Sequence, residues 1–453
     1  MQPADPSDIR PPWAQSDRAV PRVIVRPLQD FLRSSTAGAV PLLIAVLVAL
    51  AWANSPWWRS YEAIWSASVV VRIGRWAIVE DVRFWINEGL MTLFFLLAGL
   101  EIKRELTTGE LRHRRAALLP VAGAIGGMVV PVAIFLAWTH GTAAAHGWGM
   151  AMPTDLVFAL AILALASRAL PAGVRPFVLT LAIVDDLLTV VVVGLFYAHD
   201  LSVLPLVGVL LSLAAMIVLE RAHVRHLAPY VGLGALTWFL AYAAGVHPAL
   251  VGAVLGVLAP AYPFNRPAAV SAAAHRIAEG TADDPDPPDA DEASWFELSR
   301  LSNEAVSPLA RIERALLPWV NLFVVPAFAL ANAGVRLHGD ALEGRAATLL
   351  IVGLVSARVL GKLVGVTGGS LLATRLGLGR LPDGVGLRIL AGAALAAGAP
   401  FTVSLFVAST TFAAETGLLA AADVGVLLSV LACAIAAAIV LRSRSTGDAT
   451  GTR

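Results

Sequence analysis

The chain has 453 residues, of which 58% are hydrophobic and only 14% are charged, and its formal net charge at pH 7 is +1. Its mean hydropathy is +0.75. These values lie outside the range of soluble domains, so the composition predicts an integral membrane protein. The single cysteine, Cys433, excludes an intrachain disulfide.

Apolar runs of about 20 residues recur along the chain, which is the length that an α-helix needs to cross a hydrocarbon core. The runs are apolar on every face, whereas the strands of a membrane β-barrel would alternate polar and apolar residues. We therefore expect an all-α polytopic bundle of about twelve transmembrane helices. The expected spans are residues 37–54, 84–102, 116–138, 148–167, 176–197, 201–219, 228–245, 248–262, 315–334, 347–373, 388–411 and 421–441.

Basic residues cluster before the first span and after the second, sixth, tenth and last spans. If twelve spans alternate in direction, all these clusters lie on one side, which predicts that both termini are cytoplasmic. The first 35 residues show no cleavable signal peptide. We expect cytoplasmic tails at 1–35 and 443–453, spans one to eight within 36–262, and spans nine to twelve within 313–442.

Two segments between spans stand out. The β-branched residues 69–79 centre on Gly74 and predict an outer hairpin near 66–83, with an ordinary loop as the alternative. Open hairpin edges are closed by pairing with a second copy, which predicts a homodimer. The second segment, 263–312, is an acidic, Pro-rich cytoplasmic insertion that we expect to lack regular structure.

Two adjacent carboxylates, Asp185 and Asp186, lie in the middle of the apolar run Phe177–Phe196. Each acid at that depth costs about 2.5–3.5 kcal/mol. Neighbouring side chains on a helix point about 100° apart, so the two face different partners or opposite walls of one cavity. Low dielectric and mutual repulsion favour protonation, and such a pair can exchange protons for a cation. The alternative is a pair buried against polar helix partners.

Two spans contain helix-breaking sequences. Pro153 leaves Thr154 and Asp155 at the start of a new helical segment, where a hydroxyl and a carboxylate suit free backbone amides. The segment Gly398–Thr402 interrupts span eleven in a similar way. Paired interruptions predict a transporter site at the bilayer midplane, and a plain helix start at the membrane surface is the alternative for Thr154.

A lysine, Lys362, lies inside span ten, with Arg358 one turn earlier. The lysine can neutralise an Asp or two helix C-terminal ends, or it can extend to the membrane surface instead. Like charges at this spacing repel, so one of the two is expected to have an acidic partner. The sequence does not identify which.

These motifs, in this order, resemble the NhaA family of bacterial Na+/H+ antiporters, over residues 35 to 442. The resemblance implies inverted-topology repeats and two broken helices that cross at the midplane. The matching stretches are Trp85–Met91, Phe94–Leu106, Ala124–Pro131, Thr154–Asp155, Phe158–Leu160, Leu181–Leu187, Gly245–His247, Ala329–Val335, Gly361–Lys362 and Phe401–Ser404.

The resemblance also implies roles for single residues. Asp186 would be the principal ligand of the transported Na+ and Asp185 its partner, with Thr154 lining the site. In one state Asp185 would pair with Lys362. Lys362 and Asp155 would compensate charge, Asp155 at the N-termini of the broken helices.

Three further positions match charged residues of the family. Glu101 and Arg104 fall on a cytoplasmic cluster linked to pH activation. Glu88, which replaces an acid that is usually Asp, is assigned to the same pH response. Two departures concern the site itself. Pro400 replaces an expected Gly and should stiffen the break in span eleven, and Arg358 replaces an apolar residue near Lys362.

The function implied is an electrogenic, pH-dependent Na+(Li+)/H+ antiporter of the bacterial inner membrane that exports sodium by alternating access. Such a chain is a transporter, not an enzyme, and needs no cofactor. Its partners would be small cations, protons, membrane lipid and a second copy bound through the hairpin, without nucleic acid. A sodium-coupled solute symporter is the alternative. An intramembrane aspartyl protease would require a Gly-x-Gly-Asp motif, which the sequence lacks.

Overall fold

The computed structural model describes residues 39–73, 76–112, 114–166, 170–171, 173–197, 201–222, 224, 226–282, 288–336, 344–382 and 384–442. The expected tails at 1–35 and 443–453 lie outside the described residues. So do residues 74–75 in the expected hairpin turn and the acidic stretch 283–287.

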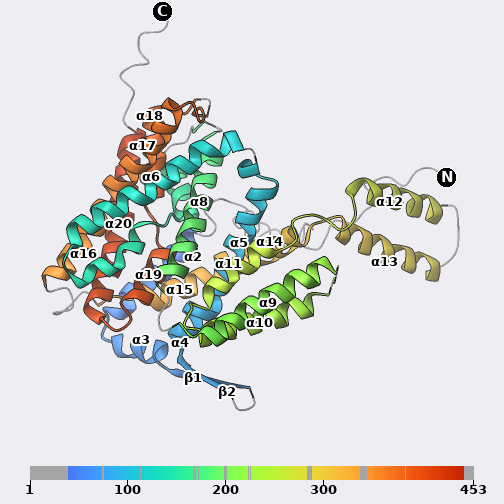
Figure 1. The fold of residues 1–453 in the computed structure, drawn as a ribbon, viewed down its shortest axis with the longest axis horizontal. Helices are drawn as coiled ribbons and strands as arrows, with labels where there is room; N and C mark the ends of the chain where they lie inside the picture. Colours follow the sequence, from blue (N-terminus) through green and yellow to red (C-terminus); the bar gives the residue numbers. More distant parts are fainter. Residues whose placement is uncertain are drawn as a thin grey trace, which may run out of the picture.

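Helices dominate the described chain (Figure 1). In chain order they are α2 (Ala39–Ala53), α3 (Trp58–Trp65), α4 (Val82–Phe84), η4 (Trp85–Leu90), α5 (Met91–Thr107), η5 (Glu110–Arg112), α6 (Arg114–Thr139), η6 (Ala143–Ala151), α7 (Leu156–Ala166), α8 (Val174–Phe196), α9 (Val203–Arg221), α10 (Leu227–Ala243), α11 (Ala249–Leu258), α12 (Pro267–Ala282), α13 (Pro288–Glu304), α14 (Pro308–Trp319), η7 (Val320–Val324), α15 (Val325–Asn332), α16 (Arg345–Ser356), η9 (Ala357–Gly361), α17 (Lys362–Arg375), α18 (Leu387–Ala397), α19 (Thr402–Thr411) and α20 (Thr416–Arg442). Here η4, η7 and η9 are π-helical turns within longer helices, and η5 and η6 are 3-10 helices.

Seven helical stretches of the described chain are long and apolar enough to cross a membrane. Three more spans are helix pairs bent at a short break, and two shorter apolar helices, α10 and α11, complete the set. These elements coincide with the twelve expected spans, so the predicted all-α membrane class is confirmed. The seven long stretches are Val82–Thr107, Ala117–Thr139, Val174–Phe196, Val203–Arg221, Pro308–Asn332, Arg345–Arg375 and Thr416–Arg442.

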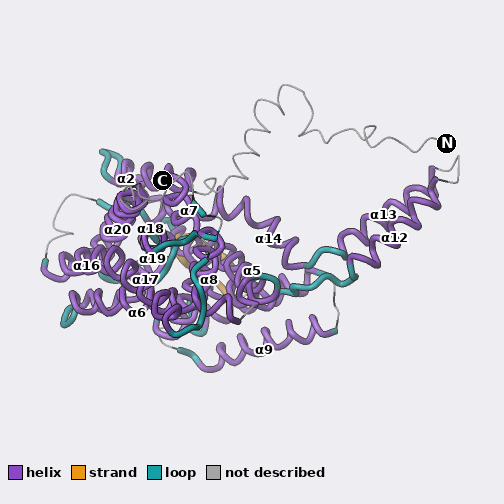
Figure 2. Tube along the Cα trace, turned by 90° about the horizontal axis from the view of Figure 1, so that it is seen from above, coloured by secondary structure: helices purple, strands orange, loops and turns teal. Residues whose placement is uncertain are grey.

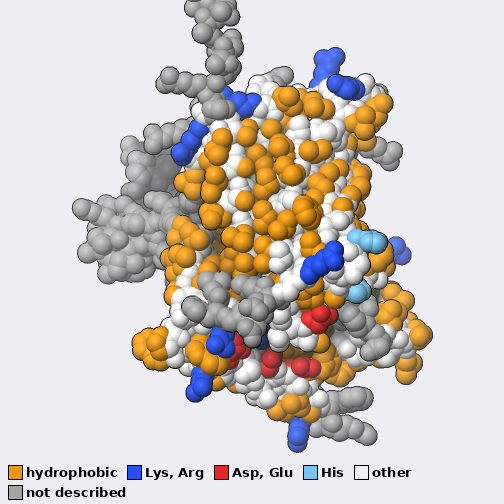
Figure 3. Space-filling view, turned by 90° about the vertical axis from the view of Figure 1, so that its left-hand side faces the viewer, with side chains coloured by type: hydrophobic (Ala, Val, Ile, Leu, Met, Phe, Trp, Pro, Cys, Tyr) orange, Lys and Arg blue, Asp and Glu red, His pale blue; other side chains and the backbone are white. Residues whose placement is uncertain are grey.

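The outer surface of the bundle is apolar, as lipid contact requires. Figure 3 shows a broad hydrophobic band on one face, with basic side chains along its upper edge and acidic side chains near its lower part. Helix α9 presents large apolar residues outward, including Leu204 at 84% exposure. Such a surface would be unfavourable in water and is favourable in hydrocarbon.

The predicted hairpin is present. Strands β1 (Ser68–Ile73) and β2 (Trp76–Asp81) pair antiparallel, with Val70 opposite Val79, and lie at the lower edge of the molecule in Figure 1. Among the described residues β1 pairs only with β2. Pairing with a second copy through this hairpin remains a prediction.

The prediction that 263–312 lacks regular structure is wrong for most of that segment. Helices α12 and α13 lie within it, pack against each other and project away from the bundle (Figures 1 and 2). The physical reason is local: α12 is rich in alanine, the best helix former, and Pro288 occupies the first position of α13, where proline costs no hydrogen bond. Helix α14 also begins inside the expected insertion, at Pro308.

Glycines bring α6 and α17 into backbone contact. A Cβ atom on Gly126 would lie 2.2 Å from the carbonyl oxygen of Gly365, and a Cβ on Gly365 would lie 2.2 Å from that of Gly126. Only glycine permits this approach, which is a common mode of helix packing in membranes. It places Lys362, one turn before Gly365, directly against α6.

Candidate functional site

Two broken helices meet in the core. The 3-10 helix η6 and α7 are bent by 63° at residues 152–155, and α18 and α19 are bent by 42° at residues 398–401. A hydrogen bond of 3.1 Å from the Ser404 hydroxyl to the Met150 carbonyl oxygen joins α19 to η6. Both interruptions predicted from the sequence are therefore present, and they contact each other.

The N-terminal ends of α7 and α19 share one carboxylate. Asp155 Oδ1 accepts hydrogen bonds from the backbone amides of Val157 at 3.1 Å and Phe158 at 3.3 Å. Its Oδ2 accepts a bond of 3.0 Å from the Thr402 hydroxyl, at the first residue of α19. A carboxylate suits this position because it satisfies free amides and faces the positive ends of two helix dipoles.

The first acid of the predicted pair, Asp185 on α8, forms a buried salt bridge. The Nζ atom of Lys362 lies 2.7 Å from Asp185 Oδ2, and both side chains have an exposed fraction of 0%. The Thr154 hydroxyl donates to the same oxygen at 2.5 Å. Lys362 also donates to Thr154 Oγ1 at 3.0 Å and to the carbonyl oxygen of Met152 at 2.6 Å. The acidic partner that the sequence left unassigned thus belongs to Lys362.

The second acid, Asp186, points elsewhere. It does not share the partners of Asp185, as expected for neighbours about 100° apart on a helix. Its Oδ1 atom is buried and has no hydrogen-bond partner among the described residues, and the same holds for Asp185 Oδ1. Buried carboxylate oxygens are normally satisfied, so these two free oxygens, on adjacent residues of α8, are available as ligands for a cation.

Arg358 does not pair with a carboxylate in the part of the chain that the structure describes. Its Nη1 donates to Ser429 Oγ at 2.6 Å and to the Pro400 carbonyl oxygen at 3.2 Å. Its Nη2 donates to the Met150 carbonyl oxygen at 2.9 Å. Sequence reasoning missed these partners because each is a hydroxyl or a carbonyl on a segment distant along the chain.

The charged residues predicted for the pH response separate into two places. Arg104, at the end of α5 near Glu101, forms an ion pair with Glu313 of α14. Glu88 lies on the same span but nearer the hairpin, where its Oε2 accepts a bond of 2.9 Å from the Ala249 amide. Glu313 was missed, since nothing in its local sequence indicates the contact.

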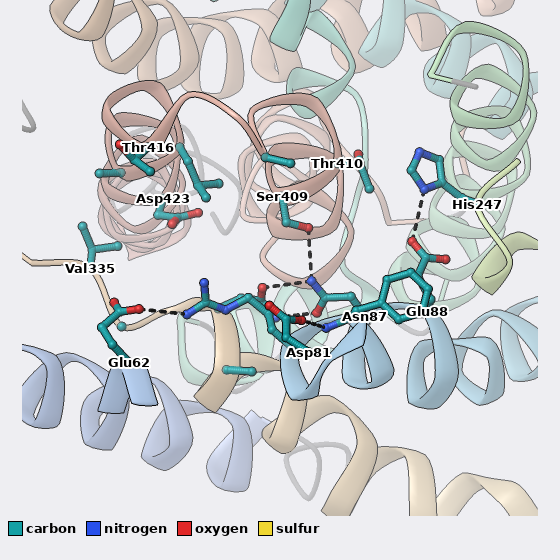
Figure 4. Close-up of a pocket in the computed structure, with 18 of the residues that line it drawn as sticks. Glu62, Asp81, Asn87, Glu88, His247, Val335, Ser409, Thr410, Thr416 and Asp423 are labelled. Carbon is teal, nitrogen blue, oxygen red and sulfur yellow. Dashed lines mark hydrogen bonds and ion pairs between the residues drawn. The ribbon is translucent and has the colours of Figure 1, made fainter. Parts of the chain in front are cut away.

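Glu88 borders a cavity of about 660 Å³. Its Oε1 lies 3.1 Å from His247 Nδ1, and Figure 4 shows this pair on one side of the cavity with Asp423 and Thr416 on the other. Asp423 is 7% exposed, on α20, and no described residue forms a hydrogen bond or ion pair with it. It was missed, although an acid within the last apolar run was the available signal.

Comparison with known proteins places the chain in a family. Residues 29–441 match the family described as Na+/H+ antiporter 1. The chain is 39% identical over 457 residues to the Na(+)/H(+) antiporter NhaA 2 of Sorangium cellulosum, covering 98% of this chain and 97% of the relative. It is 40% identical over 450 residues to the Na(+)/H(+) antiporter NhaA of Anaeromyxobacter sp., covering 98% and 96%.

A further relative, the Na(+)/H(+) antiporter NhaA of Acidovorax sp., is 41% identical over 406 residues, with 89% of this chain and 88% of the relative covered. Agreement at this level over nearly the whole length confirms the resemblance drawn from the motifs. It also excludes an enzyme, because the shared machinery is that of a secondary transporter. The chain belongs to the NhaA family of Na+/H+ antiporters.

Proposed function

We propose that this chain exports Na+ or Li+ in exchange for protons, electrogenically and with a pH-dependent rate. Asp186, Asp185 and Thr154 supply the oxygen ligands of the cation. The observation that carries the proposal is the buried Lys362–Asp185 salt bridge, beside which Asp185 and Asp186 each keep an unpartnered buried oxygen. Such oxygens suit a small hard cation.

Exchange follows from competition for these groups. A sodium ion that binds Asp186 and Asp185 displaces one proton from Asp186 and draws Asp185 away from Lys362, which then releases its own proton. On the other side of the membrane, protons return to Lys362 and Asp186 and displace the sodium. The proton-loaded site carries one more positive charge than the sodium-loaded site, so each cycle moves net charge. The ion pair supports Lys362, rather than Asp185, as the carrier of the second proton.

Alternating access requires that the two broken helices move together around a fixed site. Asp155 balances the N-terminal ends of α7 and α19 and links them through Thr402. Lys362 donates a hydrogen bond to the Met152 carbonyl oxygen, and so compensates the partial negative charge at the end of η6, while it also pairs with Asp185. With these contacts the two broken helices can change their tilt together, while the backbone groups at their interrupted ends stay paired and are not exposed to the membrane.

The rate responds to pH in two ways under this proposal. Protons compete directly with sodium at Asp186 and Lys362. In addition, the Arg104–Glu313 ion pair near Glu101 and the Glu88–His247 contact both lie along the span Val82–Thr107, and a change in charge at either place would bias the position of that span.

Topology follows from the positive-inside pattern. We place both termini and the α12–α13 insertion on the cytoplasmic side of the bacterial inner membrane, and the β1–β2 hairpin outside. A homodimer through the hairpin is supported by the exposed side chains of Val69, Val70 and Val71 and by the edge of β1 that pairs with no other described strand.

Proton flux in everted vesicles tests the exchange. Addition of Na+ or Li+ should release protons from the loaded lumen with the wild-type chain, and Asp186→Asn should abolish this flux while leaving the amount of folded protein unchanged. Full flux from Asp186→Asn would overturn the assignment. Acceleration of Na+ uptake by an organic solute would point instead to a symporter.

A further inference from the structure

Arg358 is fully buried in the core, close to the ion site but outside the proposed exchange. Its exposed fraction is 0%, and its three hydrogen bonds reach three separate elements: η6 through Met150, the break after α18 through Pro400, and α20 through Ser429. A buried guanidinium without a carboxylate is costly unless other groups compensate it.

The compensating groups share one property. Met150 lies in the last turn of η6, and Pro400 follows the end of α18, so both carbonyl oxygens belong to the C-terminal sides of the two interrupted helices. Helix C-termini carry unsatisfied carbonyls and partial negative charge, which a cation stabilises. Asp155 forms the matching contact at the N-terminal ends of α7 and α19.

We propose that Arg358 is a positioning residue for cation exchange, which ties the C-terminal ends of both broken helices together and neutralises them, and thereby leaves Lys362 free to pair with Asp185. The inference rests on the proposed function. Lys362 contacts one of these ends as well, through the Met152 carbonyl oxygen at 2.6 Å. Arg358, one turn earlier on the same helix, contacts both ends.

The geometry requires arginine in particular. Nη1 and Nη2 donate in different directions, to Pro400 and Met150, while Nη1 also reaches Ser429. A lysine ammonium is a single flexible point charge and cannot hold both carbonyls in a fixed fork. Arg358→Lys therefore keeps the positive charge but loses the simultaneous hydrogen bonds to the two carbonyl oxygens. Arg358→Met loses both the charge and the hydrogen bonds.

These variants separate positioning from charge. With Arg358→Lys the maximal rate of Na+-dependent proton flux should fall roughly three- to tenfold, because the crossing is no longer held in one geometry. The half-saturating Na+ concentration at alkaline pH should stay at the wild-type value. With Arg358→Met that concentration should fall by roughly three- to tenfold, because one fewer positive charge opposes sodium in a low-dielectric site.

Arg375→Met is the matched control, since Arg375 is an exposed arginine on the same continuous helix. It should leave both the rate and the half-saturating concentration unchanged. A merely structural role for Arg358 would lower the amount of folded protein without moving the half-saturating concentration. If Arg358→Met does not fold, the maximal rate of Na+-dependent proton flux by Arg358→Lys still tests the positioning role.

The inference is overturned if Arg358→Lys transports at the wild-type rate, or if Arg358→Met folds and binds sodium with wild-type affinity. In both cases a wild-type chain that exchanges Na+ for protons shows that the proposed function survives. A wild-type chain without Na+-dependent proton flux would overturn the proposed function and this inference with it.

Discussion

The ammonium nitrogen of Lys362 lies 2.7 Å from the carboxylate of Asp185, and neither side chain is accessible to solvent. The two charges come from different helices, α17 and α8, and a hydroxyl from the broken span, Thr154, completes the contact. Under the proposed function, sodium and protons compete for this set of atoms, so variants of the pair test the exchange directly.

Removal of one partner should be worse for stability than removal of both. Lys362→Met leaves Asp185 as a buried charge without its partner, and the free energy of unfolding should fall by about 3–5 kcal/mol. The double variant Lys362→Met with Asp185→Asn should recover most of this loss. Thermal unfolding of the purified protein in detergent measures both. If the two single effects simply add in the double variant, the residues are not coupled.

The apparent affinity for sodium should depend on pH. Because protons and sodium compete for the same site under the proposed function, the half-saturating Na+ concentration should rise as the pH falls, by up to about tenfold per pH unit for each competing proton. High Na+ should restore the rate. Flux measured over a grid of pH and Na+ concentration tests this. A maximal rate that falls with pH at constant half-saturating Na+ would favour a separate pH gate over direct competition.

The backbone contact between α6 and α17 should tolerate no side chain. Gly126→Ala would place a methyl group 2.2 Å from the Gly365 carbonyl oxygen, force the helices apart and shift Lys362. We expect a loss of about 1–3 kcal/mol in stability and a reduced rate of exchange. Gly368→Ala, on α17 with no atom within 4 Å of the new Cβ, is the control and should be neutral or slightly stabilising. Equal effects of the two variants would contradict the prediction.

The hairpin should matter for assembly more than for transport. Val70→Lys places a charge in the middle of β1, opposite Val79, and should shift the protein from dimer to monomer while exchange continues. Arg72→Lys, on the same strand, keeps the charge and should leave the dimer intact. The mass of the detergent-solubilised particle by multi-angle light scattering distinguishes the two states. A wild-type protein that is monomeric in this measurement would contradict the proposed dimer interface.

Features that depend on local sequence were predictable. The spans follow from apolar runs of sufficient length, and the breaks follow from Pro153 and from the segment around Pro400, because proline cannot continue a helix. The hairpin follows from β-branched residues around a glycine. The acidic residues and prolines around 283–289 predicted irregular structure for the whole insertion. The alanines of 267–282 and the position of Pro288 at the start of 288–304 favour the helices that are present.

Features that depend on contacts between distant segments were not predictable. The partners of Arg358 are backbone carbonyls and a serine, groups that every sequence contains in quantity. The ion pair of Arg104 with Glu313 joins residues more than 200 positions apart. Charge spacing alone did not decide whether Lys362 or Arg358 pairs with a carboxylate; only the family resemblance indicated Lys362, because the choice depends on which neighbouring helices each side chain faces.

The hairpin continues directly into the second span. Strand β2 ends at Asp81, whose carboxylate caps α4 at Phe84 with a bond of 2.7 Å, and the helix then runs without a break to Thr107. The Glu88–His247 contact and the Arg104 ion pair both lie along this single rod. A second copy bound at the hairpin would therefore contact the same continuous helix that carries the Arg104–Glu313 pair near its other end, which connects the proposed dimer interface to the proposed pH-responsive cluster.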